Sequence, residues 1–192
     1  MTTNRLEAFS DGVMAIIITI MVLELKIPDE QTWASLIPLI PKFSSYLFSF
    51  IYVGIYWNNH HHLFQAIEKV NGKILWANLH LLFWLSLLPF ATAWLGEHSL
   101  NNRPPAFLYG CILLMCAISY ALLEKFAIQH EGATSKIARA IKSNLKEKIS
   151  ILLYLSGILC SLIYPYLSLV LYYTVTILWL VPDRRIEKQH QP

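Results

Sequence analysis

Ionisable and hydrogen-bonding side chains stand inside or beside long apolar runs at three places in this sequence. Ser10 and Asp11 come just before the run AIIITIMVLEL, the stretch NNHHH covers residues 58–62, and Asn78 and His80 lie within a third apolar segment. Polar groups at membrane depth are costly, so by default they mark either a working site or a buried structural network. The chemistries open to these residue types are metal binding, acid–base catalysis, proton sensing and hydrogen bonding between helices.

Three consecutive histidines, His60, His61 and His62, first suggest a metal site. Neighbours on a helix point about 100° apart, however, so these rings cannot converge on one ion. No HExxH or comparable spacing occurs, and we expect no metal and no cofactor. No serine or cysteine stands in a recognisable nucleophile context, so we do not expect an enzyme. Proton sensing stays open, since a histidine beside a carboxylate such as Asp11 titrates near physiological pH.

The composition indicates that lipid surrounds most of the chain. Of the 192 residues, 56% are hydrophobic and only 14% are charged, and the mean hydropathy is +0.48. About a quarter of the residues are charged in a typical soluble domain. A net charge of +3 with scattered cations does not indicate nucleic-acid binding. We therefore expect an all-α integral membrane protein whose residues 1–192 form a single domain.

Six apolar runs are long enough, or nearly so, to cross a bilayer as helices, which takes about 20 residues. The first is expected to be retained rather than cleaved, because its start carries acidic residues and no small-residue cleavage site follows it. The last two are short halves around Tyr164-Pro165-Tyr166, so one broken helix is the alternative to a hairpin. The predicted helices cover residues 9–27, 43–62, 74–95, 106–123, 149–164 and 166–181, with a kink at Pro89 in the third.

The basic residues orient these helices. With six spans and both termini cytoplasmic, the outer segments hold only Lys26, Lys42 and Arg103, and the other twelve of the 15 basic residues face inward. This asymmetry is the one that the positive-inside rule requires. All three polar groups then lie at one depth near the cytoplasmic face, where a shared hydrogen-bonded network is the economical prediction. The basic segment 133–150 has the apolar spacing of an amphipathic helix on the inner membrane surface.

The first helix has two faces with different surroundings. At 100° per residue, Ile20 and Leu23 lie within about 40° of Ile16, whereas Asp11 lies about 140° away. If Asp11 packs against the next two helices, the isoleucine–leucine stripe faces either lipid or another copy of this helix. Periodicity alone does not choose between these, because the helix is apolar on nearly all sides.

The pattern Arg5-x-x-x-Phe9-Ser10-Asp11, followed by the AIIITIMVLEL run, resembles the signature of the transmembrane protein 175 family. This family comprises the endolysosomal potassium channels and their prokaryotic relatives. The segments YWNNHHHLF and LPFATAWLGEH and the positions of Asn78 and His80 are also of the family's kind. The resemblance covers the first half of the chain well, and a single six-helix unit is similar to the prokaryotic members.

The resemblance implies a homotetrameric cation channel in the lipid bilayer of a bacterial plasma membrane, with the first helix of each copy lining a central pore. The family's hydrophobic pore positions fall on Ile16, Ile20 and Leu23, and the threonine associated with ion preference falls on Thr19. The family's network of hydrogen bonds falls on the motif and on two residues of the third helix, namely Arg5, Phe9, Ser10, Asp11, Asn78 and His80.

The expected mechanism is a hydrophobic gate. No TVGYG-like segment is present, and a ring of isoleucines cannot replace the hydration shell of an ion, although it can close a pore by dewetting. We therefore expect partly hydrated potassium and other monovalent cations to pass, with modest preference for potassium over sodium. A secondary transporter and a non-conducting membrane scaffold are the alternatives. A transporter needs coupling sites at mid-membrane, and residues 16–23 supply no charge there.

Overall fold

The computed structural model describes residues 3–67, 69–97, 100–132, 135, 138 and 145–180, and these residues form helices and connecting turns. Most of the basic segment 133–150, and with it the predicted amphipathic helix, lies outside the described residues. The elements are α1 (Thr3–Leu23), the 3₁₀ helix η1 (Trp33–Leu39), α2 (Ile40–Gln65), α3 (Gly72–Ser86), α4 (Leu88–Gly96), α5 (Arg103–Glu131), α7 (Leu145–Ser161) and α8 (Pro165–Leu180).

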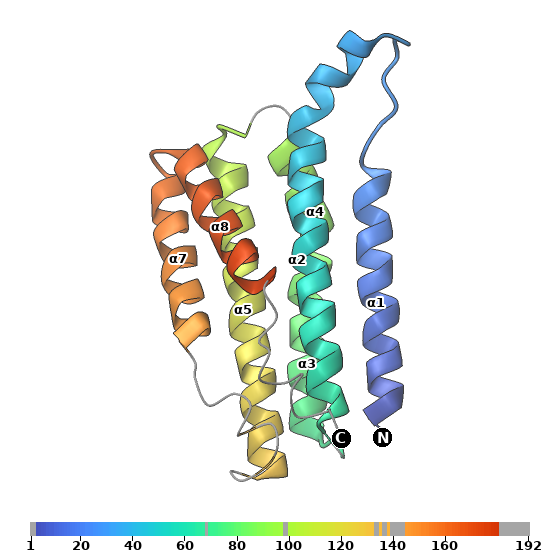
Figure 1. Cartoon of the computed structure of the whole chain (residues 1–192), viewed down its shortest axis with the longest axis vertical. Helices are drawn as coiled ribbons and strands as arrows, with labels where there is room; N and C mark the ends of the chain where they lie inside the picture. The colour runs from blue at the N-terminus through green and yellow to red at the C-terminus, as the bar shows by residue number, and fades with distance from the viewer. Residues whose placement is uncertain are drawn as a thin grey trace.

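The helices form an elongated bundle in which successive passes run in opposite directions (Figure 1). α1 lies at one edge and packs against α2, α3 and α4, while α5 contacts α3 and α4 on one side and α7 and α8 on the other. α1 begins, α2 ends and α3 begins at the same end of the bundle (Figure 1). The polar groups of these three helices therefore lie at one level.

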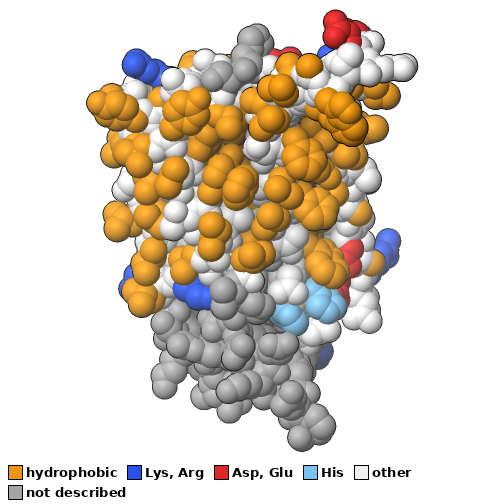
Figure 2. All heavy atoms as spheres, turned by 45° about the horizontal axis from the view of Figure 1, so that its top comes forward, with side chains coloured by type: hydrophobic (Ala, Val, Ile, Leu, Met, Phe, Trp, Pro, Cys, Tyr) orange, Lys and Arg blue, Asp and Glu red, His pale blue; other side chains and the backbone are white. Residues whose placement is uncertain are grey.

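Four helical segments in the described part of the chain are long and apolar enough to cross a membrane, namely Thr3–Leu23, Trp33–Gln65, Gly72–Gly96 and Arg103–Glu131. α7 and α8 lie side by side and antiparallel (Figure 1) and have 17 and 16 residues, which is about 24–26 Å of helix. A broad band of hydrophobic side chains covers the face shown in Figure 2, and charged side chains lie above and below it. This distribution is that of an integral membrane protein.

Several helices extend beyond the apolar runs from which they were predicted. α1 begins at Thr3 rather than at Phe9, because Arg, Leu, Glu and Ala are all good helix formers. α5 continues past Leu123 to Glu131 and stops at Gly132, whose φ of 96° suits glycine alone among ordinary residues. Charged residues end a membrane-embedded run, but they do not end a helix.

The third predicted helix is divided into α3 and α4 by a turn at Leu87. The Leu87 N–H donates to the Trp84 carbonyl at 3.3 Å, which tightens the backbone at this point. Pro89 lies in the first turn of α4, has no N–H to donate and would clash with the carbonyl of Leu85 in a continuous helix. The break therefore falls two residues before the proline rather than on it.

The α7–α8 pair is held to the bundle by one large side chain against two glycines. The ring of Tyr172 on α8 lies so close to Gly157 on α7 and Gly110 on α5 that a Cβ at either glycine would collide with it. Tyr172 is fully buried, and its hydroxyl donates to the Ala106 carbonyl at 3.3 Å. Glycine thus permits three helices to approach around one tyrosine.

Candidate functional site

The two faces of α1 differ in burial. Ser10, Met14, Ile17 and Met21 recur at helical spacing and are buried where α1 packs on α2, α3 and α4. The opposite side carries Ile16, Thr19, Ile20 and Leu23, all of which are exposed. The exposed fractions are 58% for Ile16, 43% for Ile20 and 78% for Leu23, compared with 2% for Ile17. A long apolar face of this helix is therefore left uncovered by its own chain.

A chain of buried hydrogen bonds joins α1, α3 and α2. The Ser10 Oγ lies 2.9 Å from the Asn78 Nδ2, and the Asn78 Oδ1 lies 2.8 Å from the His60 Nε2. All three residues are completely buried. Each bond crosses between two helices, so this chain fixes the rotation of α1 relative to both neighbours.

The direction of each bond in this chain follows from the first. Ser10 donates its only hydroxyl proton to the Leu6 carbonyl at 2.9 Å, so it must accept from the Asn78 amide nitrogen. The Asn78 carbonyl oxygen then faces His60, whose Nε2–H donates to it. His60 is therefore held with its proton on Nε2, and its Nδ1 is buried without a partner in the described part of the chain.

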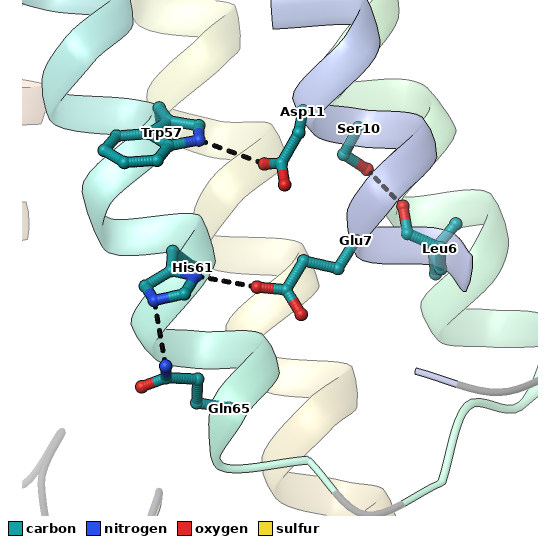
Figure 3. A network of polar contacts seen from close by, with 7 residues as sticks. All are labelled: Leu6, Glu7, Ser10, Asp11, Trp57, His61 and Gln65. Carbon is teal, nitrogen blue, oxygen red and sulfur yellow. Dashed lines mark hydrogen bonds and ion pairs between the residues drawn. The ribbon is translucent and has the colours of Figure 1, made fainter. Parts of the chain in front are cut away.

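A second set of bonds runs along the edge between α1 and α2 (Figure 3). The Trp57 Nε1–H donates to the Asp11 Oδ1 at 3.0 Å, and the Glu7 Oε1 lies 2.7 Å from the His61 Nδ1. Gln65 closes the series, with its Nε2 2.9 Å from the His61 Nε2. Glu7 and Asp11 are one turn apart on α1, and His61 and Trp57 are one turn apart on α2, so the antiparallel helices align both pairs.

His80 belongs to a different contact. Its Nε2 accepts a hydrogen bond from the Trp84 Nε1 at 3.1 Å, and its Nδ1 lies 2.9 Å from the Ser119 Oγ on α5. Ser119 donates its own proton to the Met115 carbonyl at 2.6 Å, so the His80 Nδ1–H donates to Ser119. His80 thus ties α3 to α5 and does not join Ser10 and Asn78.

The structure distributes the six predicted network residues over four surroundings. It brings Ser10 and Asn78 together, places Asp11 beside Trp57, and turns His80 toward α5. The side chains of Arg5 and Phe9 are exposed, and Arg5 makes no ion pair or hydrogen bond with another described residue. The two exposed residues therefore lie on the uncovered side of α1.

Four residues of the network did not stand out in the sequence, namely Glu7, Trp57, Gln65 and Ser119. Glu7 and Asp11 repeat at a spacing of four, as do Trp57 and His61, and residues four apart share one face of a helix. That matched spacing was the available signal for the α1–α2 edge. Nothing comparable marks Ser119, because a serine within an apolar helix usually bonds to its own backbone.

Two of the three consecutive histidines have separate partners, whereas the Nδ1 of His62 is buried without a hydrogen-bond partner among the described residues. His60 bonds to Asn78 on α3, and His61 bonds to Glu7 on α1. No group of three or more metal-ligating side chains is found among the described residues. His60 and His61 therefore act as helix–helix contacts in this structure.

Comparisons with known proteins give this arrangement a family. The sequence profile of the family described as endosomal/lysosomal potassium channel TMEM175 matches residues 5–89. A potassium channel of Chryseobacterium sp. (strain P1-3) is 61% identical over 188 residues, which cover 98% of this chain and 97% of that relative. The endosomal/lysosomal proton channel TMEM175 of Mus musculus is 32% identical over 141 residues, covering 67% of this chain but 28% of the mouse protein.

The fold is shared with a solved channel. The crystal structure of a lysosomal potassium-selective channel TMEM175 homolog from Chamaesiphon minutus is similar with a TM-score of 0.81 at 31% identity, over 94% of this chain and 97% of that chain. These relatives are channels and not enzymes. Near-complete coverage of the bacterial proteins, beside partial coverage of the mouse protein, indicates a single repeat. This chain belongs to the TMEM175 potassium channel family as a prokaryotic, single-repeat member.

Proposed function

We propose that the chain is one subunit of a potassium-permeable cation channel in a bacterial plasma membrane, in which four copies place α1 around a central pore. Both termini lie in the cytoplasm. The observation that carries the proposal is the exposed stripe of α1, defined as Ile16, Thr19, Ile20 and Leu23. A membrane helix that buries one face in its own chain and leaves a second face bare needs lipid or another copy there. Relatives named as potassium channels favour another copy.

The stripe has the chemistry of a hydrophobic gate. Four copies turn Ile16, Ile20 and Leu23 into three apolar rings, which exclude water when the pore is narrow and admit partly hydrated cations when it widens. The Thr19 hydroxyl donates to the Ile16 carbonyl at 2.8 Å, so its oxygen lone pairs are the part available to a cation. One ring of hydroxyl oxygens does not replace a full hydration shell. Preference for potassium over sodium is therefore modest.

The hydrogen bonds between α1 and its neighbours serve this function by holding α1 in one orientation. Successive residues point about 100° apart around the helix axis, so a rotation of α1 by that angle would replace exposed Ile16 with buried Ile17. The Ser10–Asn78–His60 chain and the Glu7–His61 and Asp11–Trp57 pairs oppose such a twist at the inner end. Polar side chains at the inner end of α1, away from the stripe, thus determine which side chains of this helix face the proposed pore.

Flux through vesicles that contain only the purified protein tests the proposal against its alternatives. Potassium-loaded vesicles should release potassium rapidly, without saturation and without a coupled ion. Saturable flux that requires a second ion would indicate a secondary transporter, and no flux above that of protein-free vesicles would indicate a scaffold. Repeating the measurement with sodium-loaded vesicles measures the preference between the two ions.

A further inference from the structure

A cavity lies between α2, α5, α7 and α8, on the side of the bundle away from α1 (Figure 1). Its volume is about 40 Å³, whereas a single buried water needs about 10–15 Å³ on the same measure. The cavity therefore has room for a chemical group of several heavy atoms. It plays no part in the pore proposed above, and the hydrogen bonds of α1 do not reach it.

The walls of this cavity are unusually rich in aromatic rings, with five among the lining residues: Tyr52, Tyr56, Tyr120, Tyr154 and Trp179. The polar hydrogens of three of these rings are directed into the protein. The Tyr52 hydroxyl donates to the Leu113 carbonyl at 3.0 Å, and the Trp179 Nε1–H donates to the Ser150 Oγ at 2.8 Å. The Tyr120 hydroxyl likewise donates to the Asn59 carbonyl at 3.0 Å. What remains for an occupant is mainly electron-rich ring surface and oxygen lone pairs.

One carboxylate completes the lining. Glu147, in the first turn of α7, borders the cavity and is half-buried. It makes no hydrogen bond or ion pair with another described residue. Beside it, the Lys146 ammonium lies 5.8 Å from the centre of the Trp179 ring, so the fold already places one cation against an aromatic wall of this region. The carboxylate and the rings together favour a positive charge in the cavity.

We propose that this cavity binds a small organic ammonium group, with Glu147 as counter-charge and the tyrosine and tryptophan rings as an aromatic cage. Aromatic cages are the usual recognition chemistry for alkylated ammonium ions, because the ring faces attract the charge and accept its methyl groups. A bare metal cation is a poorer fit, since it requires several oxygen ligands in place of ring faces. The ammonium belongs either to a soluble amine or to a lipid headgroup that enters from the inner leaflet.

Choline and its neutral isostere 3,3-dimethylbutan-1-ol provide the test. Both are titrated by calorimetry into the purified full-length protein in a choline-free detergent. Choline should bind at least about tenfold more tightly than the isostere, the ratio expected for one charge-assisted contact. Glu147→Gln, which keeps the size of the side chain, should lose about the same factor. Glu30→Gln, which removes an exposed carboxylate before η1, should bind choline like the unaltered protein.

The proposal fails if the protein does not bind choline, if choline and the isostere bind equally, or if Glu147→Gln binds choline unchanged. The first two outcomes concern the unaltered protein and do not depend on whether a variant folds. Repeating the titration in nanodiscs identifies the natural source. Weaker choline binding in phosphatidylcholine than in phosphatidylglycerol discs supports a lipid headgroup, and equal binding supports a soluble amine.

Discussion

At the scale of single residues, Asn78 is a fully buried polar group with hydrogen-bond partners on two other helices. Its amide satisfies His60 on one side and Ser10 on the other, within a fully buried setting. Replacing it removes both partners at once, and a buried polar group left unpaired costs about 1–3 kcal/mol. Bonds between membrane helices measure toward the low end of such ranges, because the unfolded chain also finds partners.

Asn78→Leu should therefore lower the free energy of unfolding by about 1–3 kcal/mol. Denaturant titration of the purified protein in detergent measures the change. Asn58→Leu is the matched control, since Asn58 is partly exposed on α2 and makes no hydrogen bond with another described residue. Equal effects of the two substitutions would show that the buried chain adds no stability.

The exposed stripe gives a second residue-scale prediction from two adjacent isoleucines. Ile16→Asn should leave the fold intact and raise potassium conductance or leak, because an amide in this apolar ring opposes dewetting. Ile17→Asn should mainly disturb folding, because Ile17 is 2% exposed and a buried amide there lacks partners. Flux per folded protein separates the two effects. Unchanged conduction by a well-folded Ile16→Asn protein would remove this residue from the pore.

How far the site could be predicted also depends on the residue. Ser10 and Asn78 were expected to share a network because topology placed them at one depth, and they are in hydrogen-bond contact. The depth of a residue in the membrane does not determine the direction in which its side chain points, however. His80 is only two residues from Asn78 but lies about 200° around the helix, and its partner is on α5. The role of the stripe in conduction was inferred from resemblance, and it remains a prediction.

At the scale of helices, close packing around Tyr172 limits what the α7–α8 pair tolerates. A Cβ added at Gly157 would meet the ring, whereas one added at Gly54 of α2 would meet nothing within 4 Å. Gly157→Ala should therefore destabilise the protein by about 1–3 kcal/mol, the usual cost of overpacking. Gly54→Ala should be neutral or slightly stabilising, because alanine favours helix.

Thermal unfolding of the two glycine variants in detergent measures this difference. A destabilised Gly54→Ala protein would indicate that another copy covers that surface, which single-chain contacts do not show. A fully stable Gly157→Ala protein would mean that Tyr172 adjusts without cost. The comparison thus reports on packing within and between chains separately.

Hydrophobic runs predicted which segments are helical better than where each helix begins and ends. Runs locate the part of a helix that lipid surrounds, so the polar extensions at residues 3–8 and 124–131 were missed. The sequence predicted that Pro89 disturbs the third helix, but the break lies before the proline rather than at it. The reason is that the carbonyl that loses its hydrogen-bond donor lies four residues earlier in the chain. The turn at Leu87 shows this displacement.

At the scale of the whole molecule, the proposed pore requires more than one copy, because one helix cannot enclose a channel. Four copies of the 22.1 kDa chain give a particle of about 88 kDa before bound detergent and lipid. Native mass spectrometry of the purified protein should show this mass as the main species. A stable monomer or dimer that still conducts potassium would rule out the four-fold arrangement.

The length of α2 and α5 has a consequence for the bilayer itself. With 26 and 29 residues these helices measure about 39 and 44 Å, which is more than the roughly 30 Å hydrocarbon core of an average membrane. The excess length is accommodated where the helices extend into the headgroup layers or tilt. A change in bilayer thickness therefore acts on the tilt of these two helices, and the composition of the surrounding lipids becomes part of the energetics of the bundle.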